Sequence, residues 1–192
     1  MVYCCKISRD KDVIAHAFAL SSNHRKEKAE KLKNPRVREL SITAGLLLRY
    51  CLLKERIDDE KVSYSEHGKP FLKDDKLFFS LSHSGEYAAC ATSKKPIGID
   101  IQKYVDIKER TAARFCTASE LEYVKSCAEP DIEKIKLWTL KESYLKASGC
   151  STAEAFAAEF DIGGDFIRGP EGYIFEIKDD IEGYIIAVCE AD

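Results

Sequence analysis

The sequence PIGIDIQ at residues 96–102 alternates apolar residues with small or polar ones, which predicts a β-strand. Its three isoleucines then share one face and pack into a core, while Asp100 and Gln102 share the other face. A carboxylate and an amide oxygen aimed together make half of a site for a hard cation such as magnesium. A strand with one solvent-exposed face gives the same pattern, so the residues alone leave both interpretations open.

Helical and strand patterns continue on both sides of this stretch. The sequence predicts strands at 2–8, 77–82, 87–92 and 97–102, helices at 23–33, 36–55, 107–115, 117–127 and 131–148, and strand-like pieces at 159–162, 172–178 and 182–189. Thr117 or Ser119 is the expected N-cap of the helix at 117–127. Asp131 is the expected N-cap of the helix at 131–148, and Gly149 ends that helix. A faint repeat, GEYAAC at 85–90 and EGYIIAVC at 182–189, predicts two similar halves joined near residue 95.

Two polar segments could carry chemistry. In WTLKESYLK at 138–146, Glu142 and Lys146 lie one helical turn apart behind Trp138. Such a pair is more often a surface ion pair, but burial beside a tryptophan would let the glutamate hold a metal or act as a base with a shifted pKa. The segment SLSHSG at 80–85 offers hydroxyl and backbone N–H donors for an anion, although a single histidine is more often structural. No nucleophile elbow, Walker motif or dinucleotide fingerprint is present.

Composition excludes several classes of protein. The 192 residues are 45% hydrophobic and 33% charged, which excludes a disordered or fibrous chain. The net charge of −3 shows no attraction to nucleic acid or membrane, but it combines +6 over residues 1–153 with −9 over residues 154–192. Seven of the basic residues gather in 24–39, where they form either a solvated helix face or a surface for an anionic partner.

The cysteines and the N-terminus predict a cytoplasmic protein. None of the eight cysteines has the C-x-x-C spacing of a zinc or redox site, so we expect reduced thiols that act as small apolar residues. The first ten residues lack the apolar core of a secretory signal, and the longest apolar stretch, 42–53, is interrupted by Arg49.

Five segments in this order resemble the Sfp-type 4′-phosphopantetheinyl transferases. They are HGKPF at 67–71, FSLSHSG at 79–85, PIGIDI at 96–101, FCTASE at 115–120 and WTLKESYLK at 138–146. The resemblance implies an α+β fold with two similar α+β halves related by a pseudo-twofold, residues 1–95 and 96–192, and an active site in the cleft between them. It further implies a magnesium-dependent monomer that moves phosphopantetheine from coenzyme A to a serine of an acyl or peptidyl carrier protein and releases adenosine 3′,5′-bisphosphate.

The resemblance also assigns roles to individual residues. Asp100 and Glu142 match metal-binding acids, and Gln102 stands where many members have glutamate, which weakens the expected magnesium site. The implied coenzyme A contacts are Lys69, Ser82, His83, Lys141, Lys146, Arg25, Lys28 and Ser41. Glu142 is the implied base, Lys146 the group that stabilises the leaving bisphosphate, and Glu120 an acid near the metal.

Other functions fit the same residues. The acids would equally serve a magnesium-dependent hydrolase of nucleotide pyrophosphates, with water in place of the carrier serine. Gln102 is also compatible with a non-catalytic module that binds coenzyme A or a carrier protein. A shorter, trimeric holo-acyl-carrier-protein synthase is disfavoured, because 192 residues hold both halves in one chain.

Overall fold

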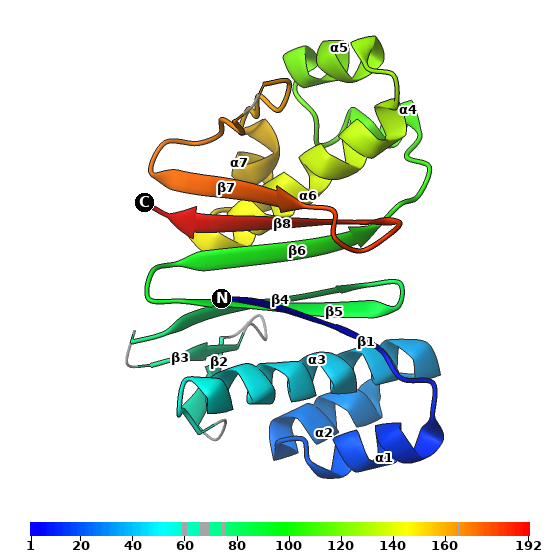
Figure 1. Cartoon of the computed structure of the whole chain (residues 1–192), viewed down its shortest axis with the longest axis vertical. Helices are drawn as coiled ribbons and strands as arrows, with labels where there is room; N and C mark the ends of the chain where they lie inside the picture. The colour runs from blue at the N-terminus through cyan, green and yellow to red at the C-terminus, as the bar shows by residue number, and fades with distance from the viewer. Residues whose placement is uncertain (59–60, 66–69, 74–75, 165) are drawn as a thin grey trace. The chain divides into compact units, whose positions relative to one another are not determined.

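The computed structural model describes residues 1–58, 61–65, 70–73, 76–164 and 166–192. The chain divides into two compact units, Met1–Lys94 and Lys95–Asp192. Each combines helices with antiparallel strands, which confirms the α+β class (Figure 1). The pseudo-twofold relation between the halves stays a prediction. In the part of the chain that is described, no helix has the length and apolar character needed to cross a membrane.

The first unit packs a long helix on a three-stranded sheet. Its elements are β1 (Val2–Lys6), α1 (Lys11–Ala19), α2 (Asn23–Lys31), α3 (Pro35–Lys54), β2 (Val62–Tyr64), β3 (Pro70–Leu72), β4 (Phe78–Ser84) and β5 (Tyr87–Ser93). The sheet has the order β1-β5-β4 with antiparallel pairing, and β2 pairs with β3 separately. The face of α3 that carries Leu48, Cys51 and Leu52 packs against Phe79 and Cys90 of the sheet. This apolar layer is the core of the unit.

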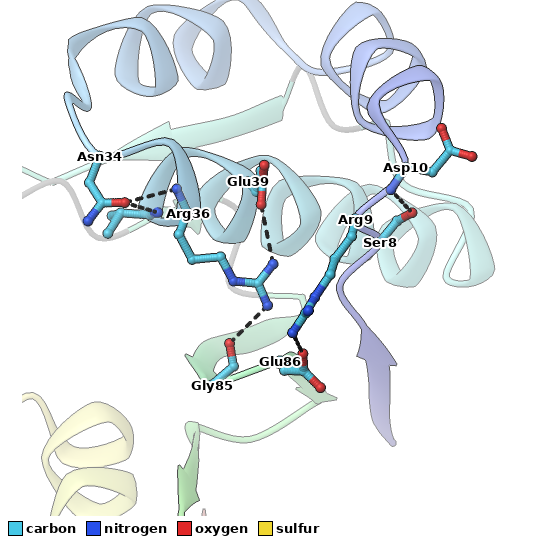
Figure 2. A network of polar contacts seen from close by, with 9 residues as sticks. Ser8, Arg9, Asp10, Asn34, Arg36, Glu39, Gly85 and Glu86 are labelled. Carbon is cyan, nitrogen blue, oxygen red and sulfur yellow. Dashed lines mark hydrogen bonds and ion pairs between the residues drawn. The ribbon is translucent and has the colours of Figure 1, made fainter.

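Polar contacts hold the turn between β4 and β5 in place (Figure 2). Gly85 adopts a φ of 56°, a left-handed conformation that favours glycine. Arg36, near the start of α3, donates to the Gly85 carbonyl at 3.4 Å and pairs with Glu39 at 3.2 Å. Arg9 pairs with Glu86 from the segment after β1. The turn that ends the SLSHSG segment is therefore attached to two other parts of the unit.

The second unit has a sheet of similar size covered by its own long helix. Its elements are β6 (Ile97–Lys103), α4 (Glu109–Ala112), α5 (Ala118–Ser126), α6 (Pro130–Ser148), α7 (Thr152–Ala157), β7 (Tyr173–Lys178) and β8 (Tyr184–Ala191). The strands pair antiparallel in the order β6-β8-β7 (Figure 1). Leu137 and Leu140 of α6 join Phe115, Phe160 and Ala187 in one buried cluster.

A single glycine sets how closely α6 approaches β6. A Cβ atom added at Gly98 would lie 1.9 Å from the carbonyl oxygen of Ser143 and 2.6 Å from the backbone nitrogen of Ala147. Both of those atoms belong to the backbone of α6 and cannot rotate away. The strand therefore needs a residue without a side chain at position 98.

Most predicted elements are confirmed, and the misses have physical causes. The N-cap Thr117 and the left-handed C-cap Gly149 are confirmed. Asp131 is not a cap, because Pro130 already begins α6; Asp131 instead pairs with Lys134 at 2.8 Å. The structure reduces the predicted helix at 107–115 to the four residues of α4 and the strand at 159–162 to one bridge, and it adds α1, α7 and the β2–β3 pair.

The cysteines behave as apolar residues of the two cores. All eight lie in the described part of the chain, and no disulfide joins them. Cys51, Cys90, Cys116 and Cys189 are buried, and Cys4 alone is classed as exposed.

Replacing Gly98 by alanine tests the close approach of α6. We expect the free energy of unfolding to fall by about 1–3 kcal/mol or more, because the added methyl group overlaps backbone atoms. Chemical denaturation of the purified variant measures this change. Gly164→Ala is the control, since nothing lies within 4 Å of a Cβ at that position. Equal stability of the two variants would contradict the interpretation.

Candidate active site

Asp100 is the buried member of an ion pair in the second unit. It is only 6% exposed, whereas Gln102 on the same face of β6 is partly exposed. Lys146 of α6 donates to Asp100 Oδ1 at 2.7 Å and to the carbonyl oxygen of Ile99 at 3.0 Å. The packing of α6 on β6 thus brings together two residues that are 46 positions apart in the sequence.

Glu142 lies one helical turn before Lys146 and is half-buried. Burial raises the pKa of its carboxyl, and the neighbouring Asp100 carboxylate raises this pKa further, while Lys146 lowers it. Asp100, Glu142 and Lys146 are therefore close enough to influence one another electrostatically. The pKa of Glu142 is raised on balance, so burial and the repulsion from Asp100 outweigh the attraction of Lys146.

This donor set fits a magnesium ion. No group of three or more histidine, cysteine or acidic residues that could hold a metal occurs in the ranges described. Magnesium is nevertheless held in many sites by one or two carboxylates, with water and substrate phosphates as the other ligands. Asp100 and Glu142 supply two carboxylates, and Gln102 follows Asp100 on the same strand face with an amide oxygen. A divalent cation would relieve the repulsion between the acids.

Lys141 and Glu120 occupy a different environment from the one expected. Their side chains are 0% and 1% exposed, and Lys141 Nζ lies 2.8 Å from Glu120 Oε2. The ammonium group also donates to the carbonyl oxygens of Phe156 and Ala158. Three oxygen partners use all three of its donors. Lys141 therefore has no donor left for a coenzyme A phosphate, and its ammonium neutralises the charge of Glu120.

In the first unit, Arg25 is a buried cation. It is 7% exposed, and its guanidinium makes one long hydrogen bond, 3.5 Å, to the hydroxyl of Ser41. No carboxylate in the described ranges pairs with it, and burial lowers the pKa of Arg25. Burial and the charge of Arg25 also lower the pKa of Lys28. These two cations, which the sequence analysis assigned to coenzyme A together with Ser41, form a site suited to an anion.

A cavity of about 490 Å³ lies beside this cluster. Its lining residues are Ser21, Ser22, Asn23, His24, Arg49, Asp58, Val62 and Tyr64. The rings of His24 and Tyr64 stack with their centroids 3.5 Å apart, and Arg25 lines an adjoining smaller cavity that also contains Arg49 and Tyr64. The sequence analysis did not assign His24, Arg49 or Tyr64 to a site. Only the basic character of 24–39 pointed to this region, because β2 and α2 are brought together by tertiary contacts.

Ser82 and His83 are neighbours on β4, so their side chains point to opposite faces of the sheet. Ser82 is buried and His83 is exposed. His83 shares its face with Phe79 and Leu81, which pack toward α3. Lys69, the remaining predicted coenzyme A contact, lies outside the described residues.

Comparison with known proteins identifies the family. The model of the 4′-phosphopantetheinyl transferase superfamily, ACPS, matches residues 96–189. The chain is 30% identical over 186 residues to 4′-phosphopantetheinyl transferase Sfp of Bacillus subtilis (strain 168), covering 88% of this chain and 82% of that protein. The chain belongs to the 4′-phosphopantetheinyl transferase superfamily. The predicted enzyme class is confirmed.

The matches to two further members of this transferase family span a smaller share of those proteins. The chain is 35% identical over 147 residues to 4′-phosphopantetheinyl transferase gsp of Aneurinibacillus migulanus, which is 72% of this chain and 62% of that protein. It is 38% identical over 103 residues to 4′-phosphopantetheinyl transferase HetI of Nostoc sp., covering 49% and 44%. The residues matched by the superfamily model include Asp100, Glu142 and Lys146.

The raised pKa of Glu142 predicts a pH-dependent stability. A carboxyl whose pKa is raised by folding stabilises the folded state at low pH, and this contribution is lost as the pH rises through the folded pKa. In metal-free buffer, Glu142→Gln should therefore raise the melting temperature at pH 7.5 but not below about pH 4. Thermal unfolding at both pH values measures this difference. Glu122→Gln, which changes an exposed acid, is the control; an equal gain in both variants would contradict the prediction.

Proposed function

We propose that the protein transfers the 4′-phosphopantetheine arm of coenzyme A to a serine of an acyl or peptidyl carrier protein. The observation that carries the proposal is the ion pair of the buried Asp100 with the partly exposed Lys146, with the Glu142 carboxyl beside it. Membership of the superfamily supports the reaction class. We further propose that the protein acts as a monomer in the cytoplasm and needs no nucleic acid or membrane.

Asp100, Glu142 and the amide oxygen of Gln102 would hold magnesium. When bound, the ion neutralises negative charge on the pyrophosphate of coenzyme A, which phosphoryl-type transfer requires. Gln102 contributes no charge, so we expect weaker magnesium binding than three acids would give.

The protein's own residues would move the proton and stabilise the leaving group. A base works best when its pKa is close to the working pH, and in the metal-free protein burial moves the pKa of Glu142 in that direction. Glu142 would accept the proton of the carrier serine, directly or through a water molecule. Lys146 would stabilise the charge on the departing adenosine 3′,5′-bisphosphate, and Asp100 holds its ammonium in place.

Residues of the first unit would bind the nucleotide part of coenzyme A. The buried guanidinium of Arg25, with Lys28 and Ser41, offers charge and hydroxyl donors to a phosphate group. Ser82, His83 and Lys69 would contact the phosphates of coenzyme A, as the family resemblance implies. Lys141 is omitted from this set because its ammonium is enclosed.

Mass spectrometry of apo carrier proteins tests the proposal. Incubation of the protein with coenzyme A, magnesium and a panel of apo acyl and peptidyl carrier domains should add one phosphopantetheine arm to at least one of them. Cleavage of coenzyme A without any carrier would instead support a pyrophosphate hydrolase. Binding of coenzyme A with neither reaction would support a binding module.

Removing the proposed base should abolish most turnover. Glu142→Gln keeps the shape of the side chain but cannot accept the serine proton, so kcat should fall by about 100-fold or more. Carrier-modification kinetics measure this change, with Glu122→Gln as the matched control. A kcat near that of the wild type would reject both proposed roles of Glu142.

Position 102 should control the affinity for magnesium. Gln102→Glu adds a third negative charge beside the ion, so the magnesium concentration that gives half-maximal rate should fall several-fold. Gln102→Leu removes the oxygen and should raise that concentration. If both variants match the wild type, Gln102 does not contact the ion or its water shell.

The buried guanidinium should contribute to coenzyme A affinity. A hydrogen bond to a charged group is worth about 1.5–3 kcal/mol, so Arg25→Met should raise the KM for coenzyme A roughly 10- to 100-fold with little change in kcat. Lys33→Met removes the same charge from an exposed residue nearby and is the control. Similar KM values for the two variants would show that general charge, not a contact at Arg25, attracts the nucleotide.

A further inference from the structure

The ammonium group of Lys141 is enclosed by three oxygen atoms from two other segments of the second unit. It lies 2.8 Å from Glu120 Oε2 of α5 and donates to the carbonyls of Phe156 at 2.9 Å and Ala158 at 2.6 Å, at the end of α7. Lys141 itself belongs to α6. One side chain therefore connects α6 to two other helices inside the second unit.

Both carboxylate oxygens of Glu120 also have hydrogen-bond partners. Its Oε2 accepts from the backbone nitrogen of Thr117 at 2.8 Å, which completes the capping box of α5. Its Oε1 accepts from the backbone nitrogen of Phe160 at 2.9 Å. The pair is thus fixed at both ends by backbone groups, and neither side chain can move without breaking several hydrogen bonds.

A buried ion pair of this kind is weak evidence for a role in stability. The cost of removing two charges from water offsets much of their attraction, and apolar replacements of similar volume are often neutral or stabilising. What such a pair can provide is a defined geometry. The residue whose geometry the pair can define is Glu142, which directly follows Lys141 on α6.

The helix that carries Glu142 is held from two sides. The backbone of α6 at Ser143 and Ala147 lies against Gly98 of β6. Lys141 precedes Ser143 by two residues, which is about 200° around the helix axis, so its contacts lie on nearly the opposite side. Contact at Gly98 sets the distance of α6 from the sheet, and contact at Lys141 opposes rotation of α6 about its axis.

Rotation matters because Glu142 reaches its partners from the side of the helix. A side-chain tip about 6 Å from the axis moves roughly 2 Å when the helix turns by about 20°. A displacement of about 1 Å at a reacting group can cost around 100-fold in rate. The orientation of α6 therefore decides whether Glu142 lies beside Asp100.

We propose that Lys141 and Glu120 are positioning residues, which fix the rotation of α6 and so hold the Glu142 carboxyl beside Asp100. This inference rests on the proposed function, because it takes Glu142 as the group that accepts the serine proton. It replaces the expected contact of Lys141 with coenzyme A by an indirect role.

The double variant Lys141→Met/Glu120→Gln tests the proposal. It removes both charges, so no unpaired charge remains buried. With the carrier that the wild type modifies, we expect kcat to fall about 10-fold or more while the KM for coenzyme A changes less than about 3-fold.

Two further variants complete the experiment. Glu120→Asp keeps the charges but withdraws the carboxylate by one methylene, and it should show a smaller change in the same direction. Lys134→Met is the matched control, since Lys134 lies on the same helix and also donates to a carbonyl, that of Ile107, two turns before Glu142. It should leave both kcat and the KM for coenzyme A unchanged.

The outcomes separate this inference from the proposed function. A folded double variant with wild-type kcat overturns it, as does a selective rise in the KM for coenzyme A. Loss of the folded state in both Glu120 variants also overturns it, because the pair would then serve folding itself. Failure of the wild type to modify any carrier would instead reject the proposed function.

Discussion

The contact between α6 and β6 at Gly98 is the constraint on which the second unit depends. Without a side chain at position 98, the helix backbone comes close enough for Lys146 to reach Asp100 at 2.7 Å. Any larger residue would hold the helix away and separate the pair. The same contact that closes the core therefore also assembles the proposed catalytic groups.

Three lysines of α6 show how the same residue type takes different roles. Lys134 and Lys141 are buried and donate to backbone carbonyls of neighbouring segments, in addition to a carboxylate. Lys146 is paired with Asp100 but remains partly exposed, with 22% of its side chain accessible. Only a partly exposed ammonium can exchange protein contacts for substrate oxygens. Exposure, rather than position in a motif, separates the proposed catalytic lysine from the positioning one.

Much of the secondary structure could be predicted from periodicity and caps. The long helices α3 and α6 and the strands β4, β5 and β6 have strong apolar patterns. Most of the misses are short: α7 has six residues, and α4 keeps only four of the nine expected, although the unpredicted α1 has nine. Short elements bury few side chains of their own, so tertiary contacts stabilise them more than local sequence does.

The sequence by itself determined the α+β class, the transferase resemblance and the types of residue at the proposed site, because local periodicity and motif spacing carry that information. It also placed Glu142 and Lys146 on one helical face. Only the tertiary structure decided that Lys141 turns inward to Glu120 while Lys146 meets Asp100, and that Arg25 is buried beside a cavity. Those outcomes depend on which distant segments surround each charge, and burial and hydrogen bonding to such segments are not encoded in local spacing.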